Sequence, residues 1–319
     1  MITLKNKLRK YKSQIYFNIH KISIRFGFFV TPVHYYVPIA NVLELEKNKS
    51  IWNIKSELPG IDLNIQKQID NLKQITTPFQ QEYVGNHIFK EAVTFITGYK
   101  FSENDRSSIG YGYIEAQALH SFIRFYKIKK IIEVGCGVSS YCSQKALEIN
   151  ERQNRTPYEM ICIEPFPSIA LRTLKTIKLI QKSVQSVPID IFRGLNKGDL
   201  LFIDSSHTIK PMGDVSYLIN EVLPYLNSGV IVHFHDIYFP YDFQRDLLET
   251  YNQHMESSLL RAFLINNRKA NVIFCMSQLH YEKSNELKEI FPEYLPEEND
   301  GGLRKNLGHF PSSIYIEIC

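Results

Sequence analysis

The chain of 319 residues lacks the features that mark several classes of protein. Its five cysteines form no Cys-x-x-Cys pair, so neither a disulfide framework nor a zinc ribbon is indicated. It has no run of about 18 uncharged apolar residues, so no segment is expected to span a bilayer, and the apolar core of a cleavable signal peptide is also missing. A reducing, cytoplasmic setting is the simplest expectation.

Acidic residues are missing from the first 43 positions, which hold seven Lys or Arg. The whole chain has a formal net charge of +4, so the positions from 44 onward hold 30 basic against 33 acidic residues. This slightly acidic body lacks the basic face that binding to phosphate backbones requires, and we expect no nucleic-acid partner.

The same basic segment has an apolar periodicity. From Leu4 to Phe29 apolar residues recur every three or four positions, with Lys and Arg on the other faces, which predicts an amphipathic helix. Three hypotheses stay open for residues 1–29. The helix docks on the body or on a second copy in a homo-oligomer, it makes a peripheral contact with a membrane, or it is a transit-like segment.

Residues 30–100 show helical patterns around a Pro-Gly turn and no evident chemistry. We therefore expect an N-terminal amphipathic helix and helical cap at 1–100, followed by one α/β domain at 101–319. An aromatic cluster at His34, Tyr35 and Tyr36 is more often core than cleft lining.

From Lys130 strands alternate with helices, which is the signature of a mostly parallel sheet covered on both faces. The expected strands are 130–134, 159–163, 184–190, 199–203, 229–235 and, as a final alternating strand, 312–318. The expected helices are 139–149, 167–181, 212–225, 242–254 and 257–266.

The stretch IIEVGCGVSSYC at 131–142 passes from a strand to a helix through two glycines. Glycine lets the backbone approach a ligand that a Cβ would repel, and the following helix directs free N–H groups at it. We expect this loop to hold a nucleotide-type ligand through Gly135, Cys136, Gly137 and Ser140. A dinucleotide stays an alternative, because Ser140 occupies the third small position of that fingerprint.

Two glutamates sharpen the expectation. Glu164 closes the second strand, where an acid accepts hydrogen bonds from both ribose hydroxyls of an adenosine. Glu133 precedes the first glycine by two residues and is expected to stabilise the loop or to meet an ammonium group of the ligand.

Two later strands each end in an acid, Asp204 in DLLFIDSSH and Asp236 in GVIVHFHDI. If these strands are parallel neighbours, the two carboxylates lie close together on the edge that carries Gly135, and they require a cation or a shared proton. We expect a divalent metal, with His235 as the third ligand.

His207 follows Asp204 by three residues, which brings its imidazole near that metal. A neutral imidazole there is suited to remove the proton of a hydroxyl, so His207 is the expected general base. His233 lies within its strand and is expected to pack instead.

The succession EVGCGVSS, IEP, GDLLFIDSSH and LPYLNSGVIVHFHDIYFP resembles class I S-adenosylmethionine-dependent methyltransferases, and in particular the metal-dependent sugar O-methyltransferase group of macrocin, mycinamicin and cephalosporin-hydroxylase-like enzymes. The resemblance covers roughly residues 100–280. It implies a Rossmann-like sheet of seven strands, mostly parallel with the last strand antiparallel, to which 312–318 is suited. His235 stands where mycinamicin-type enzymes have an acidic residue.

Carried over to this chain, the resemblance implies that Gly135 and Gly137 form the methionine side of an S-adenosylmethionine site and that Glu164 binds the ribose. It makes Asp204 and Asp236 ligands of a divalent metal, with Mg²⁺ the first expectation, and His207 the base. The implied substrate is a small molecule or glycan with adjacent hydroxyls. The open alternatives are a catechol-type O-methyltransferase, a dinucleotide-dependent oxidoreductase and a non-catalytic cofactor-binding scaffold.

Overall fold

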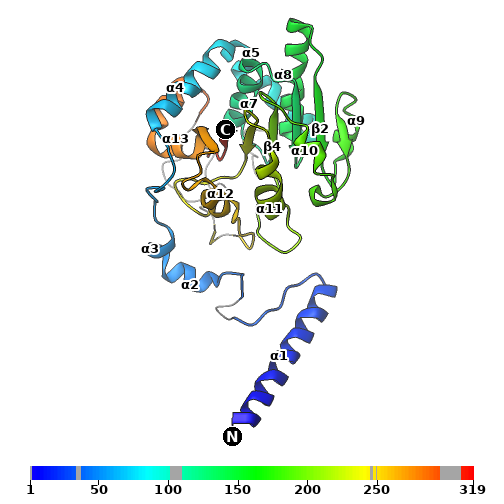
Figure 1. Ribbon diagram of the computed structural model, residues 1–319, viewed down its shortest axis with the longest axis vertical. Helices are drawn as coiled ribbons and strands as arrows, with labels where there is room; N and C mark the ends of the chain where they lie inside the picture. The colour runs from blue at the N-terminus through cyan, green and yellow to red at the C-terminus, as the bar shows by residue number, and fades with distance from the viewer. Residues whose placement is uncertain (1, 34–36, 101–109, 245–246, 249, 295–309) are drawn as a thin grey trace. The chain divides into compact units, whose positions relative to one another are not determined.

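The computed structural model describes residues 2–33, 37–100, 110–244, 247–248, 250–294 and 310–319 (Figure 1). The chain forms two compact units, Met1–Asn53 and Ile54–Cys319. The aromatic cluster expected at 34–36 lies outside the described residues.

Met1–Asn53 contains three helices: α1 (Ile2–Arg25), α2 (Val42–Lys47) and α3 (Lys49–Trp52). The amphipathic helix predicted for the basic segment is confirmed as α1. Among the described residues, no helix combines the length and the apolar character needed to cross a membrane.

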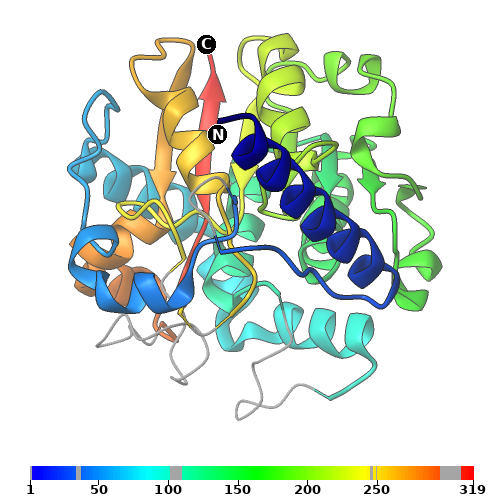
Figure 2. The ribbon, with the colours of Figure 1, turned by 90° about the horizontal axis from the view of Figure 1, so that it is seen from below.

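The second unit is built on a seven-stranded sheet in the order β3-β2-β1-β4-β5-β7-β6. Its strands are β1 (Lys130–Val134), β2 (Glu159–Ile163), β3 (Lys178–Ile180), β4 (Leu200–Ile203), β5 (Ile231–Phe234), β6 (Ala270–Cys275) and β7 (Ile314–Ile318). β7 is antiparallel to both of its neighbours, and Figure 2 shows β6 and β7 as adjacent arrows that point in opposite directions. The predicted α/β sheet with a reversed last strand is confirmed.

Helices cover both faces of this sheet. Alternate residues of a strand point to opposite faces, so Ile131 packs into one apolar cluster and Ile132 into the other. The helices that contribute to the first cluster include α4 (Ile65–Thr76), α6 (His87–Thr97), α7 (Tyr113–Phe125), α8 (Val138–Asn154), α13 (Met276–Glu282) and α14 (Ser284–Ile290). Those that contribute to the second include α10 (Asp190–Arg193), α11 (Asp214–Tyr217), the π-helix Leu218–Val222 that continues it, and α12 (Glu256–Leu264).

The helices between residues 54 and 100, which we expected as a cap, lie in the same compact unit as the sheet. Helix α4 runs along the edge strand β6, where the Asn71 amide donates to the Ile273 carbonyl and Gln68 accepts from the Cys275 N–H. These side chains satisfy backbone groups that an edge strand would otherwise expose. The short helix α5 (Gln80–Tyr83) precedes α6.

Two secondary-structure predictions between residues 167 and 190 were wrong. The region predicted as a helix at 167–181 contains only the short α9 (Ile169–Thr173) and then strand β3, which pairs with β2. The strand predicted at 184–190 is instead a 3₁₀ turn, Val184–Ser186, leading to α10. The apolar residues of 184–190 that suggested a strand, such as Val184 and Val187, pack into the second apolar cluster instead. Strand β3 was missed because three residues are too few to show a periodicity.

The helix predicted at 242–254 is not formed in the described part of that segment. Its polar side chains bind the backbone instead, because Gln244 donates to the Asn252 carbonyl and accepts from the His254 N–H. Local hydrogen bonds of this kind compete with a helix.

Candidate active site

The carboxyl ends of β1, β2, β4 and β5 meet at one edge of the sheet, since these four strands are parallel. The residues that follow them are Gly135, Glu164, Asp204 and His235 with Asp236. In the sheet, β1 lies between β2 and β4. The chain passes from β1 to β2 and β3 on one side and then returns to β4 on the other side, and a ligand crevice forms where the strand order reverses in this way. The sequence-predicted residues therefore share one edge.

Gly135 is fixed by its surroundings. Its φ is +79°, and a Cβ at this position would lie 1.7 Å from the carbonyl oxygen of Asp204. The neighbouring backbone is tied across the sheet, because the Asp204 N–H donates to the Val134 carbonyl at 2.8 Å and the Gly135 N–H to Ile163 at 3.1 Å. Only glycine fits here without moving β4.

Glu133 stabilises the same loop through buried hydrogen bonds. It is fully buried, and its Oε1 accepts from the hydroxyls of Ser139 at 2.6 Å and Ser140 at 2.9 Å. Its other carboxyl oxygen, Oε2, is buried without a hydrogen-bond partner. Burial raises the pKa of Glu133 to about 8, although both serine hydroxyls oppose this change. Ser140 also accepts from the Gly137 N–H at 3.0 Å, so it supports the loop from within.

A cavity of about 420 Å³ opens beside this loop at the ends of β1, β2 and β4. Gly135 and Glu164 line it, whereas the other predicted cofactor-binding residues, Glu133, Cys136, Gly137 and Ser140, do not. Both carboxyl oxygens of Glu164 are held, one by the Cys136 N–H at 3.2 Å and one by the Phe166 N–H at 2.7 Å. The carboxylate is thereby fixed at the cavity wall.

The cavity also has lining residues that the sequence reasoning missed. They lie in two segments, Ser183, Val184 and Gln185 after β3, and Lys210, Met212, Gly213 and Asp214 after β4. The first segment was predicted as a strand, and the second contains no recognisable motif. Neither could be assigned to the cavity before the fold was known.

Asp204, His207 and Asp236 converge next to this cavity. The Nε2 atom of His207 lies 3.3 Å from Oδ1 of Asp204 and 3.3 Å from Oδ2 of Asp236. One ligand atom from each of the three residues falls within 4.8 Å of the others, a spacing that fits a metal ion. His207 and Asp236 have φ values of +58° and +55°, a left-handed conformation that costs about 1–3 kcal/mol for such residues and clusters at functional sites.

His207 is oriented from behind by Glu256, a fully buried carboxylate whose Oε2 lies 2.8 Å from Nδ1 of the imidazole. The His207 carbonyl accepts from the Met255 N–H at 2.7 Å, at the start of helix α12. Burial lowers the pKa of His207, but the charge of Asp236 and the hydrogen bonds with Asp204 and Glu256 outweigh it and raise the pKa well above its usual value.

His235 lies between Asp204 and Glu115. Its Nδ1 lies 3.3 Å from Oδ1 of Asp204, and its Nε2 lies 3.3 Å from Oε2 of Glu115 on α7. Both ring nitrogens thus face carboxylates, and the set that fits a metal contains His207 in place of His235. His235 as a ligand stays a prediction.

Sequence reasoning missed three residues around this cluster. Glu115 and Glu256 are buried acids that contact His235 and His207, and each comes from a helix remote in sequence. His254 lies with its ring 4.7 Å from that of His207 and with Nδ1 3.9 Å from Oδ2 of Asp236. No motif surrounds any of the three.

His233 is buried in the core, as predicted. Its ring lies 4.2 Å from Phe202 and is stacked at 4.2 Å on Tyr315. Burial lowers the pKa of His233 to about 3, so the ring is neutral and structural.

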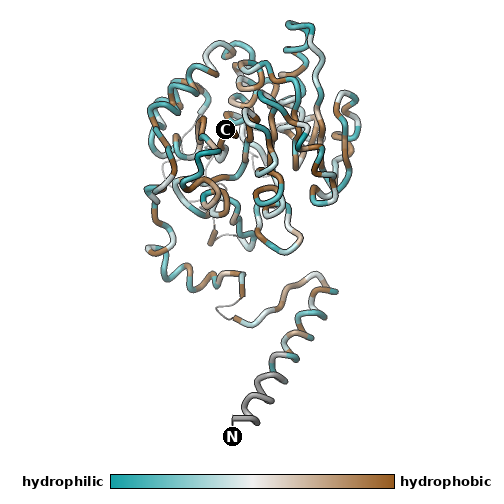
Figure 3. The backbone as a smooth tube through the Cα atoms, viewed as in Figure 1, coloured by the Kyte–Doolittle hydropathy of each residue, from teal (hydrophilic) through white to brown (hydrophobic). Residues whose placement is uncertain are grey.

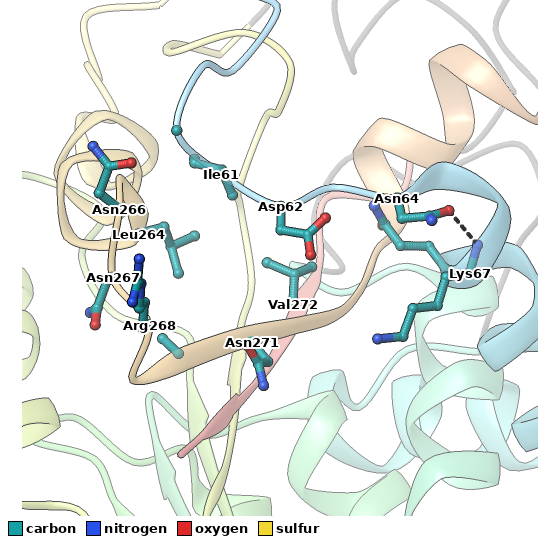
Figure 4. Close-up of a pocket in the computed structure, with 13 residues that line it drawn as sticks. Ile61, Asp62, Asn64, Lys67, Leu264, Asn266, Asn267, Arg268, Asn271 and Val272 are labelled. Atoms are coloured by element: carbon teal, nitrogen blue, oxygen red, sulfur yellow. Dashed lines mark hydrogen bonds between the residues drawn. The ribbon is translucent and has the colours of Figure 1, made fainter.

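A second cavity, of about 540 Å³, lies away from these motifs, at the start of β6 (Figure 4). Figure 4 shows Asp62 and Lys67 on the α4 side and Asn266, Asn267 and Arg268 on the other side. Most of these polar side chains are exposed, and this cavity contains none of the predicted site residues.

Comparison with known proteins identifies one matching family, described as a methyltransferase domain, over residues 132–237. An uncharacterised protein of Archaeoglobus fulgidus is 28% identical over 197 residues, which cover 60% of this chain and 84% of that protein.

Solved structures give weaker matches. A putative protein-L-isoaspartate O-methyltransferase of Plasmodium falciparum in complex with S-adenosyl-L-homocysteine has a TM-score of 0.31 and 12% identity, covering 52% of this chain and 84% of its own. A putative methyltransferase of Thermobifida fusca has a TM-score of 0.33 and 9% identity, covering 82% and 96%. At such low scores the family match is the finding that bears on function.

Proposed function

We propose that this chain, an S-adenosylmethionine-dependent methyltransferase, transfers the methyl group to a hydroxyl of a sugar or glycan, with the help of a divalent metal and a histidine base. The observation that carries the finer part of the proposal is the convergence of Asp204, His207 and Asp236 beside the cavity at Gly135.

The cavity suits the cofactor. Each oxygen of Glu164 accepts one backbone N–H, and a carboxylate oxygen has a further lone pair, so both stay able to accept from ribose hydroxyls. The unpartnered Oε2 of Glu133 lies behind the glycine loop, where a cationic ligand would favour its ionised form. S-adenosylmethionine supplies an activated methyl group on a sulfonium, so the protein's task is to position the acceptor.

The Asp-His-Asp cluster suits a divalent metal. Two carboxylates and one imidazole are a donor set that accepts Mg²⁺ and, because of the imidazole, also Mn²⁺ or Fe²⁺. A ligating histidine characteristically donates its other ring N–H to a carboxylate, and Glu256 occupies that position behind His207. A metal held there would supply a binding site for adjacent hydroxyls and would lower the pKa of the attacking one.

His207 is the proposed base, and the metal is then held by Asp204 and Asp236, because an Nε2 lone pair that binds a metal cannot also accept a proton. In the neutral ring, donation from Nδ1 to Glu256 leaves the lone pair on Nε2, which points at the cluster and hence at an acceptor bound there. With a cation held at Asp204 and Asp236, the charges that favour the protonated His207 ring would be neutralised, and Nε2 would be free to take the proton of the hydroxyl.

A sugar acceptor is favoured over a catechol by the motifs shared with sugar O-methyltransferases and by the polar groups around the cluster. Ser312 donates to Asp236 at 3.0 Å, and the Tyr238 hydroxyl lies 3.0 Å from Nδ1 of His254. Such groups suit a ligand with many hydroxyls better than a flat aromatic ring.

The test follows labelled methyl from S-adenosylmethionine into glycan and phenol pools, with the full chain, with EDTA and with His207→Ala. Transfer into glycans should stop with EDTA and fall by at least about 100-fold in His207→Ala, while binding of S-adenosylhomocysteine is retained. Label in phenols instead would identify a catechol-type acceptor, and cofactor binding without any transfer would identify a scaffold.

Metal affinity then separates the two roles of His207. A base leaves Mn²⁺ binding within about twofold in His207→Ala, whereas a ligand lowers it by at least about tenfold. Transfer that continues with EDTA would contradict the metal, and transfer that continues in His207→Ala would contradict the base.

A further inference from the structure

Helix α1 carries an apolar stripe that lies outside the proposed reaction. Tyr11, Ile15, Ile19 and Ile22 recur every three or four residues, so they lie along one side of the helix, and their exposures range from 42% to 70%. Figure 3 shows hydrophobic and hydrophilic residues interleaved along the described part of this helix. None of the side chains described in Met1–Asn53 is buried, so this unit has no core of its own to cover the stripe.

The stripe ends in an aromatic tip formed by Phe26, Phe28 and Phe29. Gly27, with φ +79°, closes α1: the Phe28 N–H donates to the Ser23 carbonyl and the Gly27 N–H to Ile24, both at 3.0 Å. This pattern is a Schellman motif, which stops the helix and turns the chain. The three rings at the turn are 67–74% exposed.

The segment that carries the stripe is basic. The first 43 residues contain seven Lys or Arg and no acid. Lys12 and Lys21 extend over the rings of Tyr16 and Phe17, at 5.6 Å and 4.6 Å from the ring centres. Charge of a single sign calls for an anionic partner.

We propose that residues 2–33 bind the surface of an anionic lipid bilayer, with the stripe and the aromatic tip in the headgroup boundary and the Lys and Arg side chains among the lipid phosphates. An amphipathic helix with a basic polar face lies in the plane of such a surface. A second copy of α1 is a poorer partner, because its segment brings seven more positive charges and no acid. The bilayer offers apolar and anionic contacts together.

The test uses the full chain and co-sedimentation with vesicles of equimolar phosphatidylglycerol and phosphatidylcholine, against vesicles of phosphatidylcholine alone. The chain should bind the first and not the second. Ile22→Glu places a charge in the stripe and should weaken binding by at least about tenfold. Ile24→Glu is the matched control: Ile24 is similarly exposed, 46% against 55%, but lies two residues on and thus on the opposite side, so binding should change by about threefold or less.

Each other outcome overturns the proposal. Equal loss in both variants would show adsorption by charge alone, and equal binding to both vesicles would remove the anionic partner. If Ile22→Glu instead lowers the oligomeric mass in light scattering, the stripe joins two copies. If the chain binds no vesicles and Ile22→Glu lowers its melting temperature, the stripe packs against the rest of the same chain. This experiment does not measure methyl transfer, so a negative result for membrane binding would leave the proposed function unaffected.

Discussion

At the scale of single residues, position 135 has no room for a side chain larger than that of glycine, and the carboxyl group of Glu133 is fully buried. The first sits against the Asp204 carbonyl in a left-handed conformation, and the second is enclosed with one carboxyl oxygen unpartnered. Glu133 can be changed without touching the Asp-His-Asp cluster, whereas a side chain at Gly135 meets the backbone of Asp204, so the two residues give separate tests of the glycine loop.

Replacing Gly135 with Ala should destabilise the protein by about 3 kcal/mol and abolish binding of S-adenosylhomocysteine, because the new Cβ would overlap the Asp204 backbone. Thermal unfolding and calorimetric titration measure the two effects. Gly137→Ala is the control, since a Cβ there meets nothing within 4 Å. Equal effects of the two variants would contradict the steric argument.

Glu133 makes stability depend on pH. Burial raises its pKa from 4.5 to about 8, so between these values the folded protein holds a proton that the unfolded chain has released. The contribution of Glu133 is therefore fully present below pH 4.5 and is lost as pH rises to about 8, with a limiting slope of about 1.4 kcal/mol per pH unit. Urea unfolding from pH 5 to 8 should show a steeper loss in the wild type than in Glu133→Gln; parallel profiles would refute this.

At the scale of elements, a buried ion cluster joins α5 to α7 and α8. Arg124 donates to both carboxyl oxygens of Glu82, at 2.8 Å and 2.9 Å, and also to Asn150 on α8. Burial acts to raise the pKa of Glu82, but the hydrogen bonds from His120 and Arg124 outweigh it and lower the pKa to about 2. The helices that precede the sheet domain are thereby locked onto it by charge as well as by apolar packing.

Arg124→Leu should destabilise the protein by about 3 kcal/mol, because it removes both hydrogen bonds of Arg124 to the partly buried Glu82 carboxylate and leaves His120 to pair with it. Lys73→Leu is the control, since Lys73 and its partner Glu289 are 43% and 69% exposed and such a pair contributes at most about 1 kcal/mol. Chemical denaturation measures both. The Glu82 contribution should also disappear as pH falls from 4.5 to about 2. A loss in Arg124→Leu no larger than the control's would show that the cluster is not needed.

At the scale of the whole molecule, strand order assembles the site. Neighbouring parallel strands β1, β2, β4 and β5 bring the glycine loop, Glu164, Asp204 and Asp236 to one edge. The helices then supply the support: Glu115 from α7 behind His235, and Glu256 from α12 behind His207. Under the proposed function, the sheet positions the groups that touch ligands and the helices fix their orientation.

The sequence by itself determined the local patterns. Strands 130–134 and 159–163 have the predicted bounds, and Asp204 and Asp236 follow their strands, because strand periodicity and a polar residue at a strand end are visible within a few positions. Gly135 could be singled out for the same reason. The short β3 could not, since three residues carry too little pattern.

Only the tertiary structure decided which groups meet. His207 lies between Asp204 and Asp236, while His235 lies between Asp204 and Glu115, a neighbour that the sequence did not suggest. Glu115 is 120 residues from His235, and Glu256 is 49 residues from His207. Such pairings depend on how helices pack on the sheet, and packing between distant segments leaves no periodic signal in the chain.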